Sequence, residues 1–185
     1  MLEPIKTNAT YQDLYSIPEN MIGEIIDGKL YAMPRPSPRH SNVASGIAEI
    51  RGPFQHGIGG PGGWWILVEP EIKLGQDLFV PDLAGWKKER LLHPPDTNYI
   101  SIPPDWICEV LSPSTSASDR KKKMPIYAQF KVPYLWLIHP IEKTLEIFKL
   151  NGSQWLLLVT YSDDDKVKAE PFQEVEIDLA NLWWE

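Results

Sequence analysis

The chain has 185 residues, of which 43% are hydrophobic and 23% are charged, and its formal net charge is −7. This length and composition are typical of a soluble globular protein, so we expect a single domain over residues 1–185. The acidic balance argues against a protein that coats nucleic acid through bulk positive charge. It leaves open an enzyme that binds a few phosphates locally with the help of a metal ion.

The sequence also carries signals about location. No window of about 18 apolar residues is present, so we expect no membrane span. Residues 1–6 (MLEPIK) lack the apolar core of a secretory signal. Cys108 is the single cysteine, which excludes an internal disulfide and a multi-cysteine zinc site. Together these features predict a cytoplasmic protein.

Four elements are predicted before residue 64: a short helix over 10–17, a hairpin over 23–34, a helix over 39–51 and a loop over 52–63. Thr10 has the residue type of a helix N-cap. Asp27-Gly28 separates two short apolar runs, which is the strongest hairpin signal in the chain. Val43, Ile47 and Ile50 recur at helical spacing. The glycine-rich loop that follows lacks the Gly-Lys-Ser/Thr of a phosphate loop.

The rest of the chain has mainly the pattern of strands. They are predicted over 64–74, 78–86, 105–111, 134–139, 144–150, 154–161 and 173–177, with one helix over 119–131. Neither an internal repeat nor a low-complexity linker interrupts them. This order favours an α/β or α+β fold, in which helices flank a central sheet of mixed pairing.

Two carboxylates stand in apolar strands. Glu109 is the one charge in the segment 106–111 (WICEVL), and Asp82 is the one charge in the segment 78–84 (LFVPDLA). Because burying an unpaired charge is costly, each needs a partner or a metal. Pro81 lacks an N–H donor and predicts a local break that would aim Asp82 away from the sheet. Two acids on adjacent strands suit Mg²⁺, which favours oxygen ligands.

A lysine on the following helix is the third candidate. Lys123, Tyr127 and Phe130 share one helical face, and the apolar Phe130 indicates that this face looks inward. Lys123 would then point towards the sheet, whereas Lys121 and Lys122 would point more to solvent. Beside two carboxylates, an ammonium would stabilise a phosphoryl transition state, or help to position and deprotonate the attacking water.

These residues together resemble the PD-(D/E)XK nuclease superfamily, and more closely its Uma2-like family, also called DUF820. The resembling segments run in family order over about residues 12–150. They are 24–30 (EIIDGKL), His40, 80–82 (VPD), 109–115 (EVLSPST), 119–123 (DRKKK), 127–128 (YA) and 132–140 (VPYLWLIHP). The resemblance implies a restriction-endonuclease-like core, with additional C-terminal strands, that hydrolyses phosphodiesters with Mg²⁺ or with Mn²⁺ in its place.

The resemblance also implies roles for individual residues. By position, Asp82 and Glu109 would be metal ligands, Lys123 the catalytic lysine and Glu24 an additional catalytic acid. Four further residues are candidates for contact with the substrate, which we expect to be nucleic acid and DNA in particular: Arg39, His40, Lys122 and Tyr127. Family analogy and the eight tryptophans further suggest a homodimer.

The lysine departs from the parent pattern. There it lies two residues after the acid on the same strand, and here that residue is Leu111, which cannot do the chemistry. The resemblance therefore assigns the role to Lys123 on the next helix. Pro125 in that helix removes a hydrogen bond and crowds a carbonyl, so we expect an irregular first turn.

Each candidate also has a purely structural interpretation. Glu109 suits a paired strand position, Asp82 a turn, and Glu24 an exposed strand residue beside a turn. His40 could cap or pack the helix that follows it, and a run of basic residues such as 120–122 could form a solvated face.

Two other functions stay open at this point. One is a nucleic-acid-binding or assembly module on a nuclease fold, without turnover. The other is a hydrolase of a different class, in which the carboxylates act as general acid and base without a divalent metal.

Overall fold

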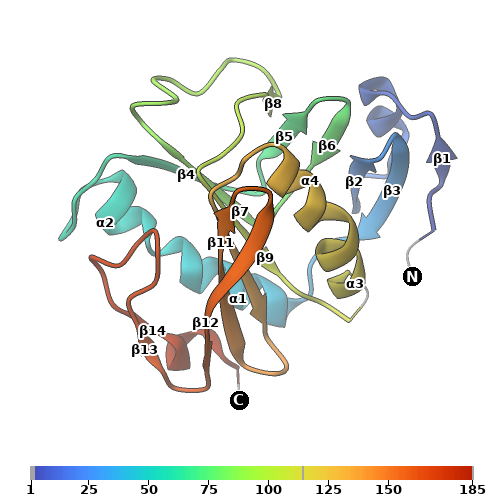
Figure 1. Ribbon diagram of the computed structural model, residues 1–185. Coiled ribbons are helices and arrows are strands. Elements are labelled where there is room, and N and C mark those ends of the chain that lie inside the picture. Colours follow the sequence, from blue (N-terminus) through green and yellow to red (C-terminus); the bar gives the residue numbers. More distant parts are fainter. Residues whose placement is uncertain (1–2, 114, 185) are drawn as a thin grey trace.

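The computed structural model describes residues 3–113 and 115–184, so Ser114 of the resembling segment 109–115 lies outside the described residues. The chain builds two six-stranded sheets and a two-stranded one. In the part of the chain that is described, no helix is long and apolar enough to cross a membrane. The result is a mixed α/β fold with few helices, as the sequence predicts, although two larger sheets replace the single central one (Figure 1).

The first sheet has the strand order β1-β3-β2-β6-β5-β8. Its strands are β1 (Lys6–Thr7), β2 (Met21–Ile26), β3 (Lys29–Pro34), β5 (Glu71–Leu74), β6 (Asp77–Phe79) and β8 (Tyr99–Ile100). The predicted hairpin is confirmed: β2 and β3 pair antiparallel around Asp27 and Gly28. Both turn residues have positive φ, at 53° and 67°, which is the backbone that a tight two-residue hairpin turn requires.

The second sheet has the strand order β12-β11-β10-β9-β7-β4. Its strands are β4 (Trp64–Val68), β7 (Leu83–Lys87), β9 (Trp106–Val110), β10 (Tyr134–His139), β11 (Thr144–Asn151) and β12 (Gln154–Ser162). Strand β9 pairs parallel with β10 and antiparallel with β7, so the sheet is mixed. Strand β12 is the edge strand at one side of the sheet.

The helical elements are short. They are η1 (Tyr11–Ser16), α1 (Pro38–Ala48), α2 (Arg51–Gln55), α3 (Ser116–Ser118), η2 (Asp119–Lys123), α4 (Met124–Gln129) and η3 (Leu179–Leu182). The two-stranded sheet pairs β13 (Lys166–Val167) with β14 (Ile177–Asp178). Thr10 precedes η1 as its N-cap, and the Asp13 side chain accepts a hydrogen bond of 2.8 Å from the Thr10 N–H, so the predicted first helix is confirmed as a 3₁₀ helix.

Several predicted boundaries are wrong. The single strand predicted over 64–74 is two strands that belong to different sheets, because the chain turns at residues 69–70, where Glu69 has a φ of 46°. The predicted loop over 52–63 begins as helix α2, and the predicted strand over 173–177 is replaced by the short β14. The two-residue strands β1 and β8 have no counterpart in the prediction, since segments this short carry no measurable periodicity.

Alternate residues along β9 and Leu111, which follows it, face two different cores. Cys108 and Val110 pack in the cluster that includes helix α1, whereas Ile107 and Leu111 pack in the cluster that includes Tyr127 of α4. Helices α1 and α4 therefore cover opposite faces of the second sheet (Figure 1). A charged side chain on either face of β9 is therefore enclosed by packed residues.

Candidate active site

The chain crosses from the first sheet to the second at Val80–Asp82. Strand β6 ends at Phe79 and β7 begins at Leu83, so the predicted strand over 78–86 is interrupted at Pro81, as its missing N–H donor indicates. Leu83 pairs with Cys108 in antiparallel register, which puts Asp82 opposite Glu109. The N–H of Val110 donates a hydrogen bond of 2.7 Å to Asp82 Oδ2. Both predicted carboxylates therefore meet at the boundary between the two sheets.

Glu109 faces the α4 side of β9, because it alternates with Cys108 and Val110, which face α1. Its carboxylate is buried, and the Tyr127 hydroxyl donates a hydrogen bond of 2.7 Å to Oε1. Lys123 Nζ lies 3.3 Å from the same oxygen. A buried carboxylate with two donors on one oxygen is held in a single orientation.

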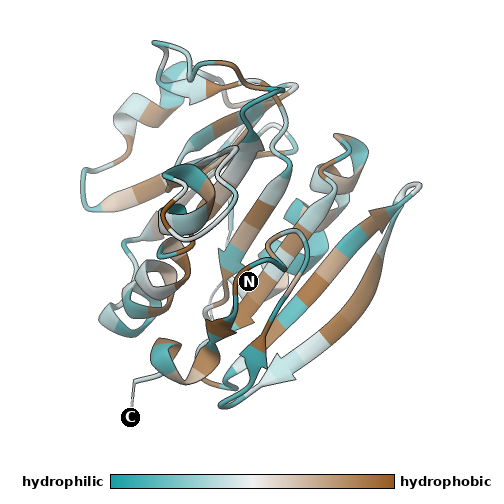
Figure 2. Cartoon of the chain, turned by 90° about the vertical axis from the view of Figure 1, so that its left-hand side faces the viewer, coloured by the Kyte–Doolittle hydropathy of each residue, from teal (hydrophilic) through white to brown (hydrophobic). Residues whose placement is uncertain are grey.

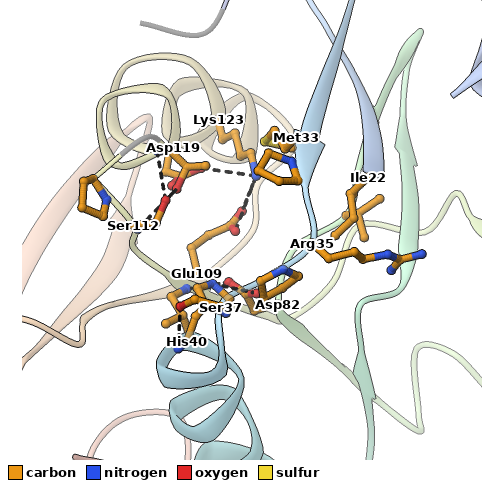
Figure 3. A pocket seen from close by; sticks show the side chains of 16 residues that line it. Ile22, Met33, Arg35, Ser37, His40, Asp82, Glu109, Ser112, Asp119 and Lys123 are labelled. Atoms are coloured by element: carbon orange, nitrogen blue, oxygen red, sulfur yellow. Dashed lines mark hydrogen bonds and ion pairs between the residues drawn. The ribbon is translucent and has the colours of Figure 1, made fainter. Parts of the chain in front are cut away.

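Lys123 is the centre of the buried charge cluster. Its ammonium lies 2.9 Å from Glu24 Oε1, 3.3 Å from Glu109 Oε1 and 3.3 Å from Asp119 Oδ1, and the residue is only 4% exposed. The three carboxylates come from β2, β9 and η2 respectively. Figure 3 shows the Lys123 ammonium between Asp119 and Glu109. The sequence-predicted residues Glu24, Glu109 and Lys123 are thus brought into direct contact.

Burial and crowding shift the pKa values of this cluster. Burial raises the pKa of Glu109 well above its usual range; Lys123 opposes the shift, while Asp119 and Asp82 add to it. Burial likewise raises the pKa of Glu24 against the attraction of Lys123. Burial alone would lower the pKa of Lys123, but its carboxylate neighbours outweigh burial and hold that pKa well above the usual range. The ammonium therefore stays charged, and the acids outnumber it.

The turn that carries Lys123 is a π-helix rather than an α-helix. Within η2, the N–H of Met124 bonds to the carbonyl of Asp119, five residues earlier, and Pro125 follows in the first turn of α4. The irregular turn predicted from Pro125 is confirmed. Single π turns of this kind often occur at functional sites. Here the turn brings both Asp119 and Lys123 into the buried cluster.

A pocket of about 300 Å³ opens beside the cluster. Asp82, Glu109, Asp119 and Lys123 line it together with His40, and Figure 3 shows these side chains around one cavity. Glu24 and Tyr127 are fully buried, and their contacts place them behind Lys123 and Glu109. Glu24 and Tyr127 therefore contact side chains that line the pocket without being among its described lining residues themselves.

The donor set fits a hard divalent cation in part. Asp82 and Glu109 offer carboxylate oxygens from adjacent strands to one cavity. Among the residues that the structure describes, no group of three or more His, Cys, Asp or Glu side chains converges as a ready metal cage. Proteins usually bind Mg²⁺ through one or two carboxylates, while water and substrate phosphates complete the shell. Within residues 3–113 and 115–184, Glu24 Oε2 is a buried oxygen without a hydrogen-bond partner, a further sign that negative charge is in excess here.

The other predicted substrate contacts are spread more widely. His40 lies in the first turn of α1, where its backbone N–H donates to the Ser37 hydroxyl and its Nε2 lies 3.2 Å from Asp82 Oδ1. Burial lowers the pKa of His40, but the interaction with Asp82 reverses the shift, and the net pKa is raised. Arg39 is exposed on α1, and Lys122 donates a hydrogen bond of 3.0 Å to the Tyr31 hydroxyl. Neither belongs to the described lining of the pocket.

Asp119 was not among the sequence-predicted site residues. It is 3% exposed and is an ion-pair partner of Lys123. Two signals were available: its place in the resembling segment 119–123, and its spacing of four residues from Lys123, which places two side chains on one face of a helix.

Comparisons with known proteins agree with this fold. The model of the Uma2 family, described as "Putative restriction endonuclease", matches residues 9–180. The fold is similar to the crystal structure of a "putative nuclease belonging to DUF820" from Anabaena variabilis ATCC 29413, with a TM-score of 0.75 and 23% sequence identity, over 95% of this chain and 97% of that chain. No curated protein matches the sequence. The resemblance drawn from the sequence is therefore confirmed, and the chain belongs to the Uma2 family.

Proposed function

We propose that this protein is a divalent-metal-dependent endonuclease that hydrolyses phosphodiester bonds of nucleic acid. One observation carries the proposal: a buried ammonium contacts three carboxylates at the wall of a pocket that Asp82 and Glu109 also line. Paired carboxylates with an adjacent cation suit a reaction in which negative charge develops on phosphoryl oxygens. Membership in a family described as "Putative restriction endonuclease" supports the same reaction class.

In this proposal Asp82 and Glu109 hold Mg²⁺, or Mn²⁺ in its place, through their carboxylate oxygens. A metal ion held there would supply polarisation of the phosphodiester and a lowered pKa for a bound water. The Val110 N–H fixes one oxygen of Asp82, and the Tyr127 hydroxyl fixes one oxygen of Glu109. These contacts orient both carboxylates before a substrate arrives, which reduces the reorganisation that the reaction requires.

Lys123 acts in this proposal as a fixed positive charge. Because its pKa is raised well above the usual range, the side chain stays protonated and cannot take a proton from water. It offsets the negative charge that develops in the transition state. Glu24 accepts a hydrogen bond of 2.8 Å from the Val80 N–H and holds the Lys123 ammonium, so it serves as a positioning residue.

The proposed substrate is DNA, because the family description names restriction endonucleases. His40 reaches the described pocket wall and is the proposed substrate contact inside it. Arg39 is exposed one residue before His40, and Lys122 lies one residue before Lys123. We place any contact from these two with the nucleic acid outside the pocket.

The test is a cleavage assay with purified protein, plasmid DNA and Mg²⁺ or Mn²⁺, in parallel with Asp82→Asn and Lys123→Met. Both substitutions should reduce cleavage by at least about a hundredfold, because each removes a charge that the transition state requires. Glu142→Gln is the matched control: its carboxylate is 70% exposed, and it should cleave like the unmodified protein. Equal cleavage by Asp82→Asn and the unmodified protein would contradict the assignment.

The specific observation that favours a second function is that Lys123 is already neutralised by its carboxylate neighbours. This neutralised cluster would be sufficient for a nucleic-acid-binding or assembly module on the same fold, because such a module catalyses no reaction. Binding of DNA without cleavage under all metals would support that module. Cleavage of another ester bond that persists in EDTA would support the metal-independent hydrolase instead.

We further propose that the protein is a homodimer that pairs through β12. This edge strand contains no charged residue, and Leu156, Leu157 and Leu158 are 51%, 45% and 38% exposed. Hydrophobic residues run along the hairpin of β11 and β12 at the rim of the molecule (Figure 2). Long, apolar edges of this kind pair readily with another strand.

Charge favours an antiparallel arrangement of two such strands. The Lys131 ammonium donates a hydrogen bond of 2.9 Å to the Gly152 carbonyl at the start of β12, and the acidic run 163–165 follows its end. Antiparallel pairing would put the basic end of one copy beside the acidic end of the other. We also propose a cytoplasmic location, because Cys108 is a buried free thiol, which suits a reducing compartment.

A further inference from the structure

We propose that Arg35 is a substrate-binding residue that holds the phosphate next to the scissile one, so that the enzyme selects a polynucleotide chain over a small phosphodiester. This inference rests on the proposed nuclease function. It concerns a residue that neither the family pattern nor the buried cluster includes.

The active-site pocket has an electrostatic problem that Arg35 can solve. Asp82, Glu109 and Asp119 line the pocket, and all three repel a phosphodiester. Lys123 is already in contact with three carboxylates and is 4% exposed. Among the described lining residues, Arg35 is the other permanently charged cation, and its side chain is 55% exposed. It is therefore the cation on this wall that a nucleic acid can reach from solvent.

The backbone presents Arg35 in a restricted conformation. The residue lies between Pro34, the last residue of β3, and Pro36, two residues before α1 begins. A residue that precedes proline is confined largely to extended conformations, and the flanking rings fix the φ of their own residues. Part of the ordering cost of binding is thus met before the ligand arrives.

The guanidinium is held by contacts that a phosphate can replace. One nitrogen, Nη1, lies 3.6 Å from Glu69 Oε2, and Nη2 donates a long hydrogen bond of 3.3 Å to the Glu19 carbonyl. An exposed ion pair of this kind contributes little to stability. Arginine carries five N–H donors in a planar fork that matches two phosphate oxygens. Exchange of Glu69 for a phosphate would therefore cost little and form a stronger contact.

The position of Arg35 points to a neighbouring phosphate rather than the scissile one. In Figure 3 its side chain points away from Glu109 and Lys123. Arg35 also lines a second pocket of about 260 Å³, which shares Ile22 and Val80 with the active-site pocket. A strand that leaves the first pocket towards the second would pass the guanidinium, which is the cation among the described residues of a pocket that Glu19, Glu69 and Glu71 also line. A small phosphodiester with a single phosphate would lie in the first pocket and gain nothing from Arg35.

The experiment compares Arg35→Ala with Lys29→Ala in two assays. Lys29 is the first residue of β3, whereas Arg35 follows its last, and the Lys29 side chain is 44% exposed, so its substitution removes the same charge at the far end of that strand. The first assay measures binding of a fluorescent oligodeoxynucleotide by anisotropy across a salt series without divalent metal. The second measures cleavage of that oligonucleotide and of bis(p-nitrophenyl) phosphate with Mn²⁺.

We expect Arg35→Ala to weaken oligonucleotide binding by about tenfold or more and to lower the slope of log K against log salt by about one, as the loss of one phosphate contact predicts. The KM of Arg35→Ala for the oligonucleotide should rise in proportion to the loss of binding. Its kcat/KM should fall about tenfold more on the oligonucleotide than on bis(p-nitrophenyl) phosphate. Arg35→Lys should restore part of the binding, because lysine keeps the charge without the fork. Lys29→Ala should match the unmodified protein.

Three outcomes would overturn the inference: unchanged binding and salt slope in Arg35→Ala, an equal loss on both substrates, or the same loss in Lys29→Ala. Failure of the unmodified protein to cleave either substrate would reject the nuclease proposal. The anisotropy series would then still decide whether Arg35 contacts a phosphate, so failure of one proposal is distinguishable from failure of the other.

Discussion

A lysine that is buried among carboxylates is the residue on which the site depends. Lys123 neutralises part of the charge that β2, β9 and η2 bring together, and its own charge is retained because those acids surround it. Breaking a buried ion pair on one side leaves an uncompensated charge, which usually costs more free energy than the pair itself contributes.

Replacement of Lys123 by methionine should therefore destabilise the fold by about 3–5 kcal/mol near pH 8, where its carboxylate partners would ionise without a counterion. The loss should shrink at about pH 5, because protonation of the acids removes their repulsion. Urea unfolding at the two pH values measures both effects. Lys121→Met, which changes an exposed residue of the same turn, should stay within about 0.5 kcal/mol of the unmodified protein.

Glu109 predicts the pH dependence of the unmodified protein. Its pKa in the folded state lies well above the usual value of 4.5, because burial disfavours the ionised form. The contribution of Glu109 to stability is thus complete below that usual value and is lost as the pH rises through the folded pKa, by up to about 1.4 kcal/mol per pH unit. Glu109→Gln should flatten this decline in metal-free urea melts. A decline as steep in the variant would contradict the assignment.

At this scale the sequence could identify Glu109 and Asp82, because each is a lone charge in an apolar strand. Lys123 followed from helical spacing and the family pattern. Glu24 was harder to assign from the sequence, because its strand also suits an exposed residue. The structure shows that the side chain is buried and contacts Lys123. No periodicity reveals such a contact, since it joins residues about a hundred positions apart.

At the scale of elements, the sequence predicted most strands but not where they end. The break at Pro81 was predictable from the missing N–H donor, and the irregular turn before α4 from Pro125. The turn at residues 69–70, which divides the chain between two sheets, was not. Strands β4 and β5 were predicted as one strand, and their separation depends on which partner strands each one finds.

Strand β7 directly follows Asp82, and its backbone is closely packed at Gly85. A Cβ added there would lie 3.2 Å from a ring carbon of Trp106 and 3.3 Å from one of Trp64, and both tryptophans are buried. Gly85→Ala should therefore destabilise the protein by about 1–3 kcal/mol. Gly52→Ala in α2 has no atom within 4 Å of the added Cβ and should be neutral or stabilising. Thermal melts of the two variants measure the contrast; equal melting temperatures would refute it.

At the scale of the whole molecule, the proposed pairing of β12 edges makes a prediction about mass in solution. Light scattering coupled to gel filtration should give twice the chain mass for the unmodified protein. Substitution of both Leu156 and Leu158 by glutamate should give the single-chain mass, because like charges would face each other across the strand pair. Ile141→Glu, at another exposed position, should remain dimeric. A single-chain mass for the unmodified protein would refute the interface.

The crossing between the two sheets at residues 80–82 also affects the order in which activity and secondary structure are lost on unfolding. Glu24 lies in the first sheet and Val80 directly follows its strand β6, whereas Asp82 and Glu109 lie at the second sheet. Because Lys123 contacts both Glu24 and Glu109, the charged cluster exists only while the two sheets stay docked. Partial separation of the sheets would expose the cluster to water while each hydrogen-bonded ladder stays intact. Inactivation should therefore precede the loss of secondary structure as urea is added, and circular dichroism would lag behind activity.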